Sequence, residues 1–419
     1  MKRYESYKDS GVKWLGEIPG HWEVRKIKYT FKERSQKGFP KLSLLSASQQ
    51  YGVIKKDYYE NRTVVATKGL DTLKLVCKND FVISLRSFEG GIEMSHEEGI
   101  ISPAYTILIP KKIEPSYFRH LGKTPVFINL LKMMVTGIRE GQNIDYNKLR
   151  TNLIPIPPKS EQTAIANYLD SVTSKIDEAI SQQQKMIDLL NERKQIIIQN
   201  AVTKGLDPNA KMKDSGVEWI GEIPEDWELY KLKYLFRLNK LKNVGNKCKT
   251  ILSLSYGKII IKKDLNEGLS PGSYDSYQLL NSGDIVIRST DLQNDHTSLR
   301  TGLVKFDGAI TSAYIGLKNL NTRLYDSRYY QYFLHNWDIS KAIYNEGKGL
   351  RQSLNWDDIK NMLLPVLDIN EQTAIANYLD SITSKIDSSI SQCNKMISLL
   401  QERKQIIIND VVTGKVKVI

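Results

Sequence analysis

The sequence predicts two globular α/β (α+β) regions, separated by a pair of long antiparallel coiled-coil helices, with internal two-fold pseudo-symmetry. Three observations predict this fold class. Two segments of the chain are repeated, the longer repeat has the apolar spacing of a coiled coil, and the regions between the repeats alternate short β-type runs with turns. A length of 419 residues also suits two or three domains rather than one.

Two segments of the chain occur twice. Residues 8–31 read KDSGVKWLGEIPGHWEVRKIKYTF, and residues 213–236 match them at 16 of 24 positions. Residues 161–203 and 371–413 both begin EQTAIANYLDS and match at 33 of 43 positions. The regions in between align only in patches, so we expect the repeats to do one job twice and the variable regions to do related but different jobs. A duplication that left the repeats alike by descent alone is the alternative.

These patterns divide the chain into six segments. They are an N-terminal repeat segment (1–19), a first variable region (20–158), a central helix (159–205), a second repeat segment (206–224), a second variable region (225–367) and a C-terminal helix (368–419). Ser160 and Asn370 come just before the apolar runs of the two helices and are predicted to be their N-caps.

Both helical segments have the 4-3-4-3 apolar spacing of a coiled-coil seam. The first seam runs from Ile165 to Ile197 and includes Met186, and the second runs from Ile375 to Ile407 and includes Met396. A helix of about 40 residues is roughly 60 Å long and needs a partner for its seam. The other copy is the obvious partner, so we expect an antiparallel pair. Two separate helices, each packed on its own domain, are the alternative.

The net charge of +13 and the pI near 9.3 indicate a polyanionic partner. The excess charge lies in the variable regions. Residues 20–158 carry 22 basic and 13 acidic side chains, and residues 225–367 carry 20 and 15. Contact with DNA phosphates would need positive charge there.

The variable regions are predicted to be mixed α/β. One helix is expected in each region, at about 117–135 and about 327–344. The expected strands, which are separated by Gly, Ser and Asn turns, are Lys41–Leu45, Phe81–Leu85, Tyr105–Ile109, Ile251–Leu254, Asp284–Ile287 and Tyr314–Leu317.

Polar loops of the variable regions hold side chains that suit DNA. Arginine can pair with guanine, and asparagine or glutamine with adenine. The candidate base-reading residues are Gln49, Gln50, Tyr51, Arg86, Ser87, Arg139, Gln142 and Asn143 in the first region, and Ser255, Tyr256, Lys258, Arg288, Thr290, Gln293, Arg351, Gln352 and Asn355 in the second. Lysine pairs at matching positions suit phosphates, and they are Lys55, Lys56, Lys262 and Lys263. The alternative for each residue is an ordinary solvated side chain.

The repeated tryptophans are expected to be packing anchors rather than ligand-stacking residues. Trp14 and Trp219 lie in matching W-(L/I)-G-E-I-P segments beside a Gly/Pro turn. Trp22 and Trp227 follow shortly after them.

Sequence signals for catalysis or for metal binding are missing. The chain has no GxxxxGK[ST] phosphate loop, no Asn/Asp-Pro-Pro-Tyr/Phe methyltransferase motif and no Cys/His metal spacing. The sequence also has no membrane-length apolar stretch and no secretory signal, so we expect a cytoplasmic protein without a metal or cofactor of its own.

The motif D-S-G-V-x-W-(L/I)-G-x-I-P and the helix opening P-x-x-x-E-Q-x-x-I-A-x-Y-L-D (Pro157–Asp170) resemble the specificity (S) subunits of type I restriction-modification systems. The second helix departs slightly, because Pro365 lies two residues further from its Glu-Gln pair. The resemblance covers essentially the whole chain and implies a non-catalytic subunit. It implies that the variable regions are target-recognition domains, each reading half of a bipartite, asymmetric DNA target.

The same resemblance implies that the helices set the gap between half-sites and dock two methyltransferase (M) subunits, with restriction/translocase (R) subunits joining them. S-adenosylmethionine, ATP and Mg would then belong to those partners. Two other interpretations stay open on sequence alone. One is a coiled-coil scaffold whose basic heads bind nucleic acid or acidic proteins without sequence preference, and the other is a stand-alone nuclease or methyltransferase.

Overall fold

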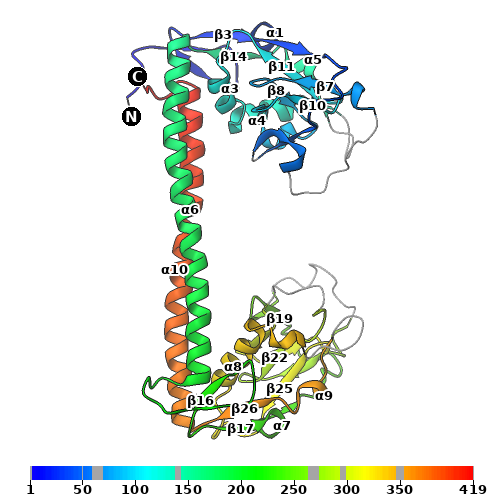
Figure 1. Cartoon of the computed structure of the whole chain (residues 1–419), viewed down its shortest axis with the longest axis vertical. Helices are drawn as coiled ribbons and strands as arrows, with labels where there is room; N and C mark the ends of the chain where they lie inside the picture. Colours follow the sequence, from blue (N-terminus) through cyan, green and yellow to red (C-terminus); the bar gives the residue numbers. More distant parts are fainter. Residues whose placement is uncertain are drawn as a thin grey trace. The chain divides into compact units, whose positions relative to one another are not determined.

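The computed structural model describes residues 2–49, 51–58, 69–136, 143–262, 273–292, 299–345 and 353–418. These residues form two compact units. Unit 1 comprises residues 1–184 and 394–419, and unit 2 comprises residues 185–393. Each unit contains one globular head and one stretch of the two long helices, α6 (Lys159–Lys204) and α10 (Ile369–Val412) (Figure 1). We call residues 2–158 head 1 and residues 206–367 head 2.

Head 1 is built around a four-stranded antiparallel sheet in the order β4-β11-β8-β9. Because side chains alternate along a strand, Phe81 and Ile83 of β8 face the main core, whereas Val82 faces a smaller second core. The strands and helices of head 1 are β1 (Tyr7–Asp9), β2 (Glu17–Pro19), β3 (Glu23–Lys26), α1 (Ile27–Thr30), β4 (Phe31–Arg34), β5 (Leu45–Ser48), β6 (Gly52–Lys55), β7 (Lys74–Val76), β8 (Phe81–Ile83), α2 (Ser87–Gly90), β9 (Glu93–Met94), β10 (Gly99–Ile101), β11 (Thr106–Pro110), α3 (Pro115–Leu121), α4 (Pro125–Met133), β12 (Val135–Thr136), β13 (Asn143–Ile144), α5 (Tyr146–Leu149) and β14 (Leu153–Ile156), with 3₁₀ turns at Lys56–Tyr58 and Leu70–Thr72.

Head 2 repeats this plan with the sheet order β18-β25-β22-β23. Ile285 and Ile287 of β22 face the main core of this head, and Val286 faces its second core. The strands and helices of head 2 are β15 (Met212–Asp214), β16 (Glu222–Pro224), β17 (Glu228–Lys231), α7 (Leu232–Leu235), β18 (Phe236–Leu238), β19 (Leu252–Ser255), β20 (Lys258–Ile261), β21 (Gln278–Leu280), β22 (Ile285–Ile287), β23 (Thr301–Leu303), β24 (Gly308–Ile310), β25 (Ile315–Asn319), α8 (Ser327–Ile339), α9 (Trp356–Ile359) and β26 (Leu363–Val366), with a 3₁₀ helix at Ala342–Asn345.

Each head is joined to the start of its following helix by the same contacts. Strand β3 pairs with β14 in head 1, and β17 pairs with β26 in head 2. Strands β14 and β26 lead into the long helices, and β3 and β17 belong to the repeated residues 8–31 and 213–236. The indole of Trp22 donates to Glu161 at 2.9 Å, and that of Trp227 donates to Glu371 at 3.2 Å. Both tryptophans are buried, which confirms that they are packing anchors.

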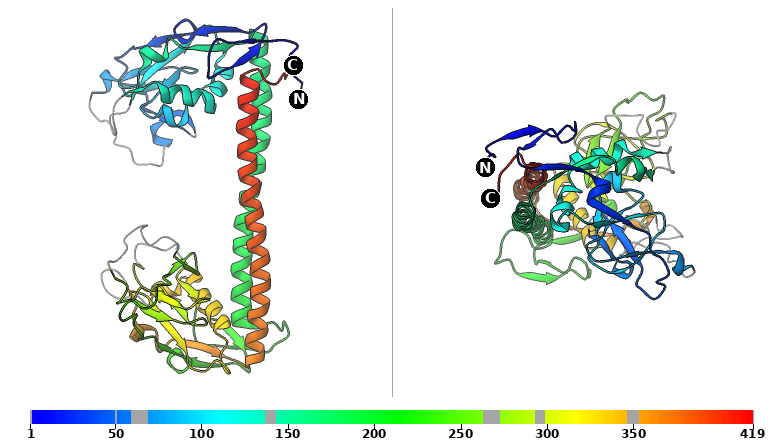
Figure 2. Two further views of the ribbon diagram at one scale, coloured as in Figure 1. Left: turned by 180° about the vertical axis from the view of Figure 1, so that it is seen from behind. Right: turned by 90° about the horizontal axis from the view of Figure 1, so that it is seen from above.

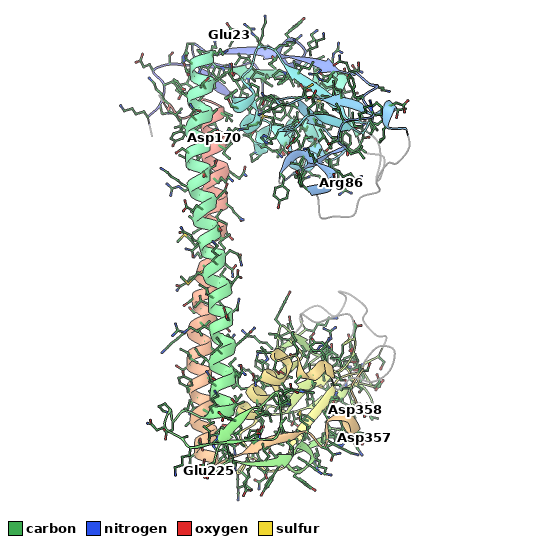
Figure 3. All side chains as sticks on the ribbon, in the orientation of Figure 1. Glu23, Arg86, Asp170, Glu225, Asp357 and Asp358 are labelled. Carbon is green, nitrogen blue, oxygen red and sulfur yellow. The ribbon has the colours of Figure 1, made fainter. Side chains whose placement is uncertain are left out.

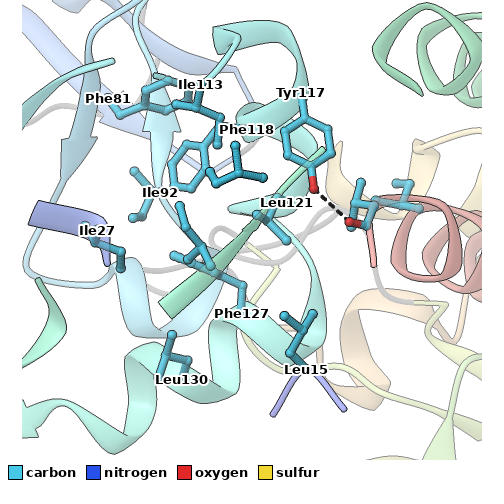
Figure 4. Close-up of a cluster of buried hydrophobic side chains, with 14 of the residues drawn as sticks. Leu15, Ile27, Phe81, Ile92, Ile113, Tyr117, Phe118, Leu121, Phe127 and Leu130 are labelled. Carbon is cyan, nitrogen blue, oxygen red and sulfur yellow. Dashed lines mark hydrogen bonds between the residues drawn. The ribbon is translucent and has the colours of Figure 1, made fainter. Parts of the chain in front are cut away.

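Each head also binds the end of the other long helix. Tyr117 of head 1 donates its hydroxyl to the carbonyl of Val412 at 2.8 Å (Figure 4), and Tyr329 of head 2 donates to Val202 at 3.0 Å. The last carbonyls of a helix have no partner within the helix, so these phenols satisfy them. Burial raises the pKa of both tyrosines, which keeps them protonated as donors.

The two long helices pair antiparallel within each unit (Figure 2). In unit 1 the start of α6 and the end of α10 share one core, and in unit 2 the end of α6 and the start of α10 share the other. Lys404 pairs with Asp177 at 2.6 Å in unit 1, and Lys194 pairs with Asp387 at 2.6 Å in unit 2. Lys404 and Lys194 occupy the same position in the two long repeats, and so do Asp177 and Asp387. The predicted antiparallel pairing is thus confirmed.

Residues 2–7 and residues 414–417 meet in unit 1. The amide of Lys417 donates to the carbonyl of Lys2 at 2.9 Å, and the hydroxyl of Tyr7 donates to the carbonyl of Gly414 at 3.2 Å. Gly414 has a positive φ of 78°, and a Cβ there would lie 2.3 Å from Pro19. A glycine is therefore required where the chain leaves α10 to reach the N-terminal segment.

The seam and the caps of the long helices differ from the sequence prediction. Met186 and Met396 were expected on the seam but are about half exposed, while the neighbouring Ile187 is buried. A straight helix of 3.6 residues per turn drifts relative to a strict 3.5-residue repeat, which shifts the buried stripe. Ser160 and Asn370 lie inside the first turn rather than at the N-caps. The carboxylate of Asp368 instead accepts the amide of Asn370 at 2.8 Å.

Three element boundaries in the heads were also wrong. The expected helix at 117–135 is two helices, because the chain turns after Leu121 and α4 restarts at Pro125 with Thr124 as its N-cap. The helix expected at 327–344 ends at Ile339 and is followed by the 3₁₀ helix at Ala342–Asn345. The strand expected at 41–45 only begins at Leu45.

Replacing Tyr117 with Phe should destabilise unit 1 by about 1–3 kcal/mol, because the buried carbonyl of Val412 loses its donor. Thermal denaturation of the full chain measures this. Tyr29→Phe is the matched control, since Tyr29 is 62% exposed and should leave the transition unchanged. Equal transitions for Tyr117→Phe and the wild type would contradict the capping role.

Candidate nucleic-acid interface

A β-hairpin in each head ends in an exposed tyrosine followed by glycine. Strands β5 and β6 lead to Tyr51-Gly52, and β19 and β20 lead to Tyr256-Gly257. Tyr51 is 57% exposed and Tyr256 is 89% exposed. A Cβ on Gly52 would lie 2.9 Å from the carbonyl oxygen of Met94, so the turn needs glycine at that position. Each head therefore presents a tyrosine at the turn of its hairpin, although the turns differ, because Gly52 already belongs to β6 and Gly257 lies before β20.

A second loop follows the equivalent strands β8 and β22. In head 1 it carries Arg86, which is exposed just before α2 (Figure 3). In head 2 it carries Arg288 and Thr290, which are both partly exposed. Each second loop thus carries a sequence-predicted arginine, but Arg86 lies three residues after β8, whereas Arg288 directly follows β22.

The hairpin and the second loop are neighbours in each head. In head 1, a Cβ on Gly90 at the end of α2 would lie 2.5 Å from the side chain of Gln49, at the hairpin turn. Gln49 and Tyr51 also border a shallow cavity of about 220 Å³ together with Lys123. In head 2, Gly257 of the hairpin lies against Leu299, whose neighbour Arg300 holds the second loop. The structure therefore brings part of each predicted set onto one surface.

Ser87, Asn355 and Lys258 are among the predicted residues that have structural partners. Ser87 is buried, and its hydroxyl accepts the amide of Ser84 at 2.9 Å. Asn355 caps α9, accepting the amide of Asp357 at 2.8 Å. Lys258 pairs with Asp387 of α10 at 3.3 Å. We therefore leave Ser87 and Asn355 out of the proposed interface.

Some of the remaining predicted residues lie within the described part of the chain, and the others lie outside it. Asn143 is exposed on β13, whereas Ser255, Lys55, Lys56 and Lys262 are only partly exposed, and Lys55 lies 3.8 Å from Glu97. The predicted residues that lie outside the described part of the chain are Gln50, Arg139, Gln142, Lys263, Gln293, Arg351 and Gln352.

Sequence analysis missed Arg300, which is fully buried in head 2. Its guanidinium donates to the carbonyls of Thr290 at 2.8 Å and Asp291 at 3.0 Å. A single arginine between a variable loop and a strand has no sequence pattern that marks it as buried. The only signal in the chain is its position directly before the buried run at Thr301 and Gly302.

Charged groups lie between the hairpin of head 2 and the helix pair of the same unit. Asp387 contacts both Lys194 of α6 and Lys258 of the hairpin. Partial burial acts to raise the pKa of Asp387, but the two lysines hold it below its usual value. His335 lies in the same cavity, beside Gly257. Burial, with a smaller contribution from the charge of Lys194, lowers the pKa of His335 to about 4.

The described residues offer no sign of a metal centre or of a membrane anchor. Among them, no three His, Cys, Asp or Glu side chains are grouped so that they could hold a metal ion. None of the helices in the described ranges is both long and apolar enough to cross a membrane.

The sequence is similar to known type I restriction enzyme specificity proteins. The family model of the type I restriction modification DNA specificity domain matches residues 19–187. The MjaVIII type I restriction enzyme specificity subunit of Methanocaldococcus jannaschii is 26% identical over 433 residues, which cover 98% of this chain and 97% of that protein.

Solved structures share the fold. A chain from a structure of complex assembly and conformational transition of the type I R-M system has a TM-score of 0.71 at 13% identity, covering 95% of this chain and 99% of that one. The HsdS subunit of Thermoanaerobacter tengcongensis has a TM-score of 0.54 at 14% identity, covering 95% and 98%.

The matched region, residues 19–187, contains most of head 1 and the first part of α6, so the class of domain that it defines is a type I DNA specificity domain. Over nearly its whole length the chain is thus similar to the specificity subunits of type I restriction enzymes, and the type I DNA specificity domain matches its residues 19–187.

The stability of unit 2 should fall as the pH is lowered from about 6.5 to 4. An unfolded histidine binds a proton below about pH 6.5, whereas the folded chain keeps His335 neutral down to about pH 4. Protonation therefore favours the unfolded state across this window, by up to roughly 3 kcal/mol.

Thermal denaturation of the full chain between pH 7 and 4 measures this effect. His335→Gln should lose this part of the pH dependence. His96→Gln is the control, because His96 is exposed and its replacement should leave the dependence in place. The same dependence in His335→Gln as in the wild type would rule out His335 as its source.

Proposed function

We propose that the two heads read the two halves of a split, asymmetric double-stranded DNA target. The observation that carries this proposal is that one framework presents two different sets of side chains. Both heads have the same sheet order, and each has a hairpin with a Tyr-Gly pair at its turn. In the loop that follows the equivalent strands β8 and β22, head 1 has Ser84 and Arg86 where head 2 has Arg288 and Thr290. Equal frameworks with unequal loops fit two unlike half-sites.

Phosphate contacts would position the complex, and loop side chains would read base edges. The net positive charge in both variable regions supports this division of labour. Arg86 and Arg288 are the residues best suited to guanine, because a guanidinium can form two hydrogen bonds to that base.

The long helices are proposed to set the gap between half-sites and to dock two methyltransferase subunits. Each unit exposes one apolar stripe on a long helix, on α6 in unit 2 and on α10 in unit 1. The two stripes occupy the same positions in the two long repeats. Their members are Met186, Leu189 and Ile196 at 49%, 60% and 50% exposure, and Met396, Leu399 and Ile406 at 47%, 50% and 53%. Exposed apolar side chains grouped in this way are typical of protein interfaces. Two equal stripes fit two copies of the same partner.

In this proposal the restriction/translocase subunits join through the assembled complex. S-adenosylmethionine, ATP and Mg²⁺ would be bound by the partner subunits. The chain would act in the cytoplasm, where its DNA target is.

Exchanging residues 20–158 for the equivalent region of another specificity subunit should change one half of the target only. Mapping methylated adenines in host DNA, with and without each version of the chain, gives both half-sites. The wild-type map is the control. A change in both half-sites would contradict the two-reader proposal. Binding without any sequence preference would instead support a nonspecific scaffold.

Leu189→Asp should weaken binding of one methyltransferase subunit at least about 10-fold, because a buried carboxylate in the interface costs more than the 1.4 kcal/mol this factor requires. Adding Leu399→Asp should weaken both. Native mass spectrometry of the complex gives the number of bound subunits.

Asn191→Asp and Gln401→Asp are the matched controls for these two changes. They add the same charge two residues along the same helices, on another face. Full occupancy in the Leu189→Asp, Leu399→Asp double variant would show that the stripes do not bind the partner.

A further inference from the structure

We propose that Arg300 is a positioning residue for sequence recognition by head 2. It fixes the main chain of the loop at residues 288–292, which we call the reading loop, and it acts from inside the head rather than by touching DNA. This inference rests on the proposed function, because it assumes that the loop reads bases.

The reading loop alternates between exposed and buried side chains. Arg288 and Thr290 are partly exposed, whereas Ser289 is 2% exposed and Leu292 is fully buried. Asp291 has a φ of +61°, a left-handed conformation that non-glycine residues seldom adopt. Such a backbone persists only when its surroundings hold it in place.

Hydrogen bonds from the interior hold four consecutive carbonyls of this loop. The guanidinium of Arg300 donates to the carbonyls of Arg288 at 3.3 Å, Thr290 at 2.8 Å and Asp291 at 3.0 Å. The amide of Leu354 donates to the remaining carbonyl, that of Ser289, at 2.8 Å. Three of the four contacts therefore come from a single side chain.

Arg300 is itself fixed by the body of head 2. Its amide donates to the buried carboxylate of Asp338 in α8 at 2.5 Å, and its Nε donates to the hydroxyl of Tyr344 at 3.3 Å. The guanidinium carbon also lies 5.4 Å from the centre of the Tyr344 ring. Arg300 thus links the reading loop to α8 through its main-chain amide and to the following 3₁₀ helix through its side chain.

An arginine is needed for this arrangement. Its planar group has five donors in a fixed fork, whereas lysine has a compact ammonium that cannot reach three separated carbonyls in the same geometry. A fully buried arginine is rare, and its burial is costly unless its donors are satisfied. Here the donors are used to hold a loop whose side chains must meet base edges within a fraction of an ångström.

Head 1 holds its equivalent loop differently. The amide of Ser84 donates to the hydroxyl of Ser87, and Arg86 follows strand β8 in a short helical turn. A change at Arg300 should therefore affect only the half-site that head 2 reads.

The test uses Arg300→Lys in the full chain assembled with its methyltransferase partner, and three duplexes. One duplex carries the intact target, and each of the others has one half-site scrambled. Discrimination at a half-site is the ratio of the Kd for its scrambled duplex to the Kd for the intact one. We expect discrimination at the head 2 half-site to fall roughly 10-fold, the loss of one good base contact, and discrimination at the head 1 half-site to stay unchanged.

Arg323→Lys is the matched control, because Arg323 is exposed in the same head and its replacement should leave both ratios unchanged. A loss of folded protein would weaken binding to all three duplexes and leave the ratios alone. If Arg300→Lys does not fold, Tyr344→Phe removes the acceptor of Nε and should lower the same ratio about 2- to 3-fold. Unchanged ratios in the folded variants would overturn the proposal. A wild-type chain with no discrimination at either half-site would instead overturn the proposed function.

Discussion

A long helix with a narrow apolar stripe cannot bury that stripe by itself, and the rest of this protein depends on two such helices covering each other. In unit 1 the start of α6 lies against the end of α10, and unit 2 has the reverse combination. The ion pairs Lys404–Asp177 and Lys194–Asp387 fix the register at corresponding places. Because both helices satisfy the same pairing rule, their sequences are constrained alike, and this accounts for the near identity of the two long repeats.

The attachment of the heads follows from that pairing. Each head is bound to the start of one helix through a tryptophan and a glutamate, and to the end of the other helix through a buried tyrosine. These contacts use the repeated segments and the inner face of each head. The loops on the outer surface take no part in them, so their sequences can diverge without disturbing the junction. Residues that join the heads to the helices are therefore kept alike in the two halves, whereas loop residues outside these junctions can differ.

Sequence analysis could predict the long helices and their antiparallel pairing, because these depend on periodicity and repetition. It placed Met186 on the seam because a heptad pattern assumes ideal supercoiling over the whole helix. It merged α3 and α4 because apolar periodicity continues across the turn before Pro125. It selected Ser87 and Asn355 as DNA contacts because their residue types suit bases, although local hydrogen bonds use them. Arg300 could not be found, because its partners are main-chain carbonyls, which leave no trace in the sequence.

Unit 1 is discontinuous in sequence, whereas unit 2 is a single stretch of chain. Val411 and Val412, near the end of the chain, share a core with Leu169, and Val412 accepts the hydroxyl of Tyr117. During synthesis, head 1 must therefore wait for the end of α10 before its core can close. A ribosome that stalls within α10 leaves an open apolar surface on head 1, while head 2 can already be complete. Head 2 can thus complete its fold before head 1, although head 1 is synthesised earlier.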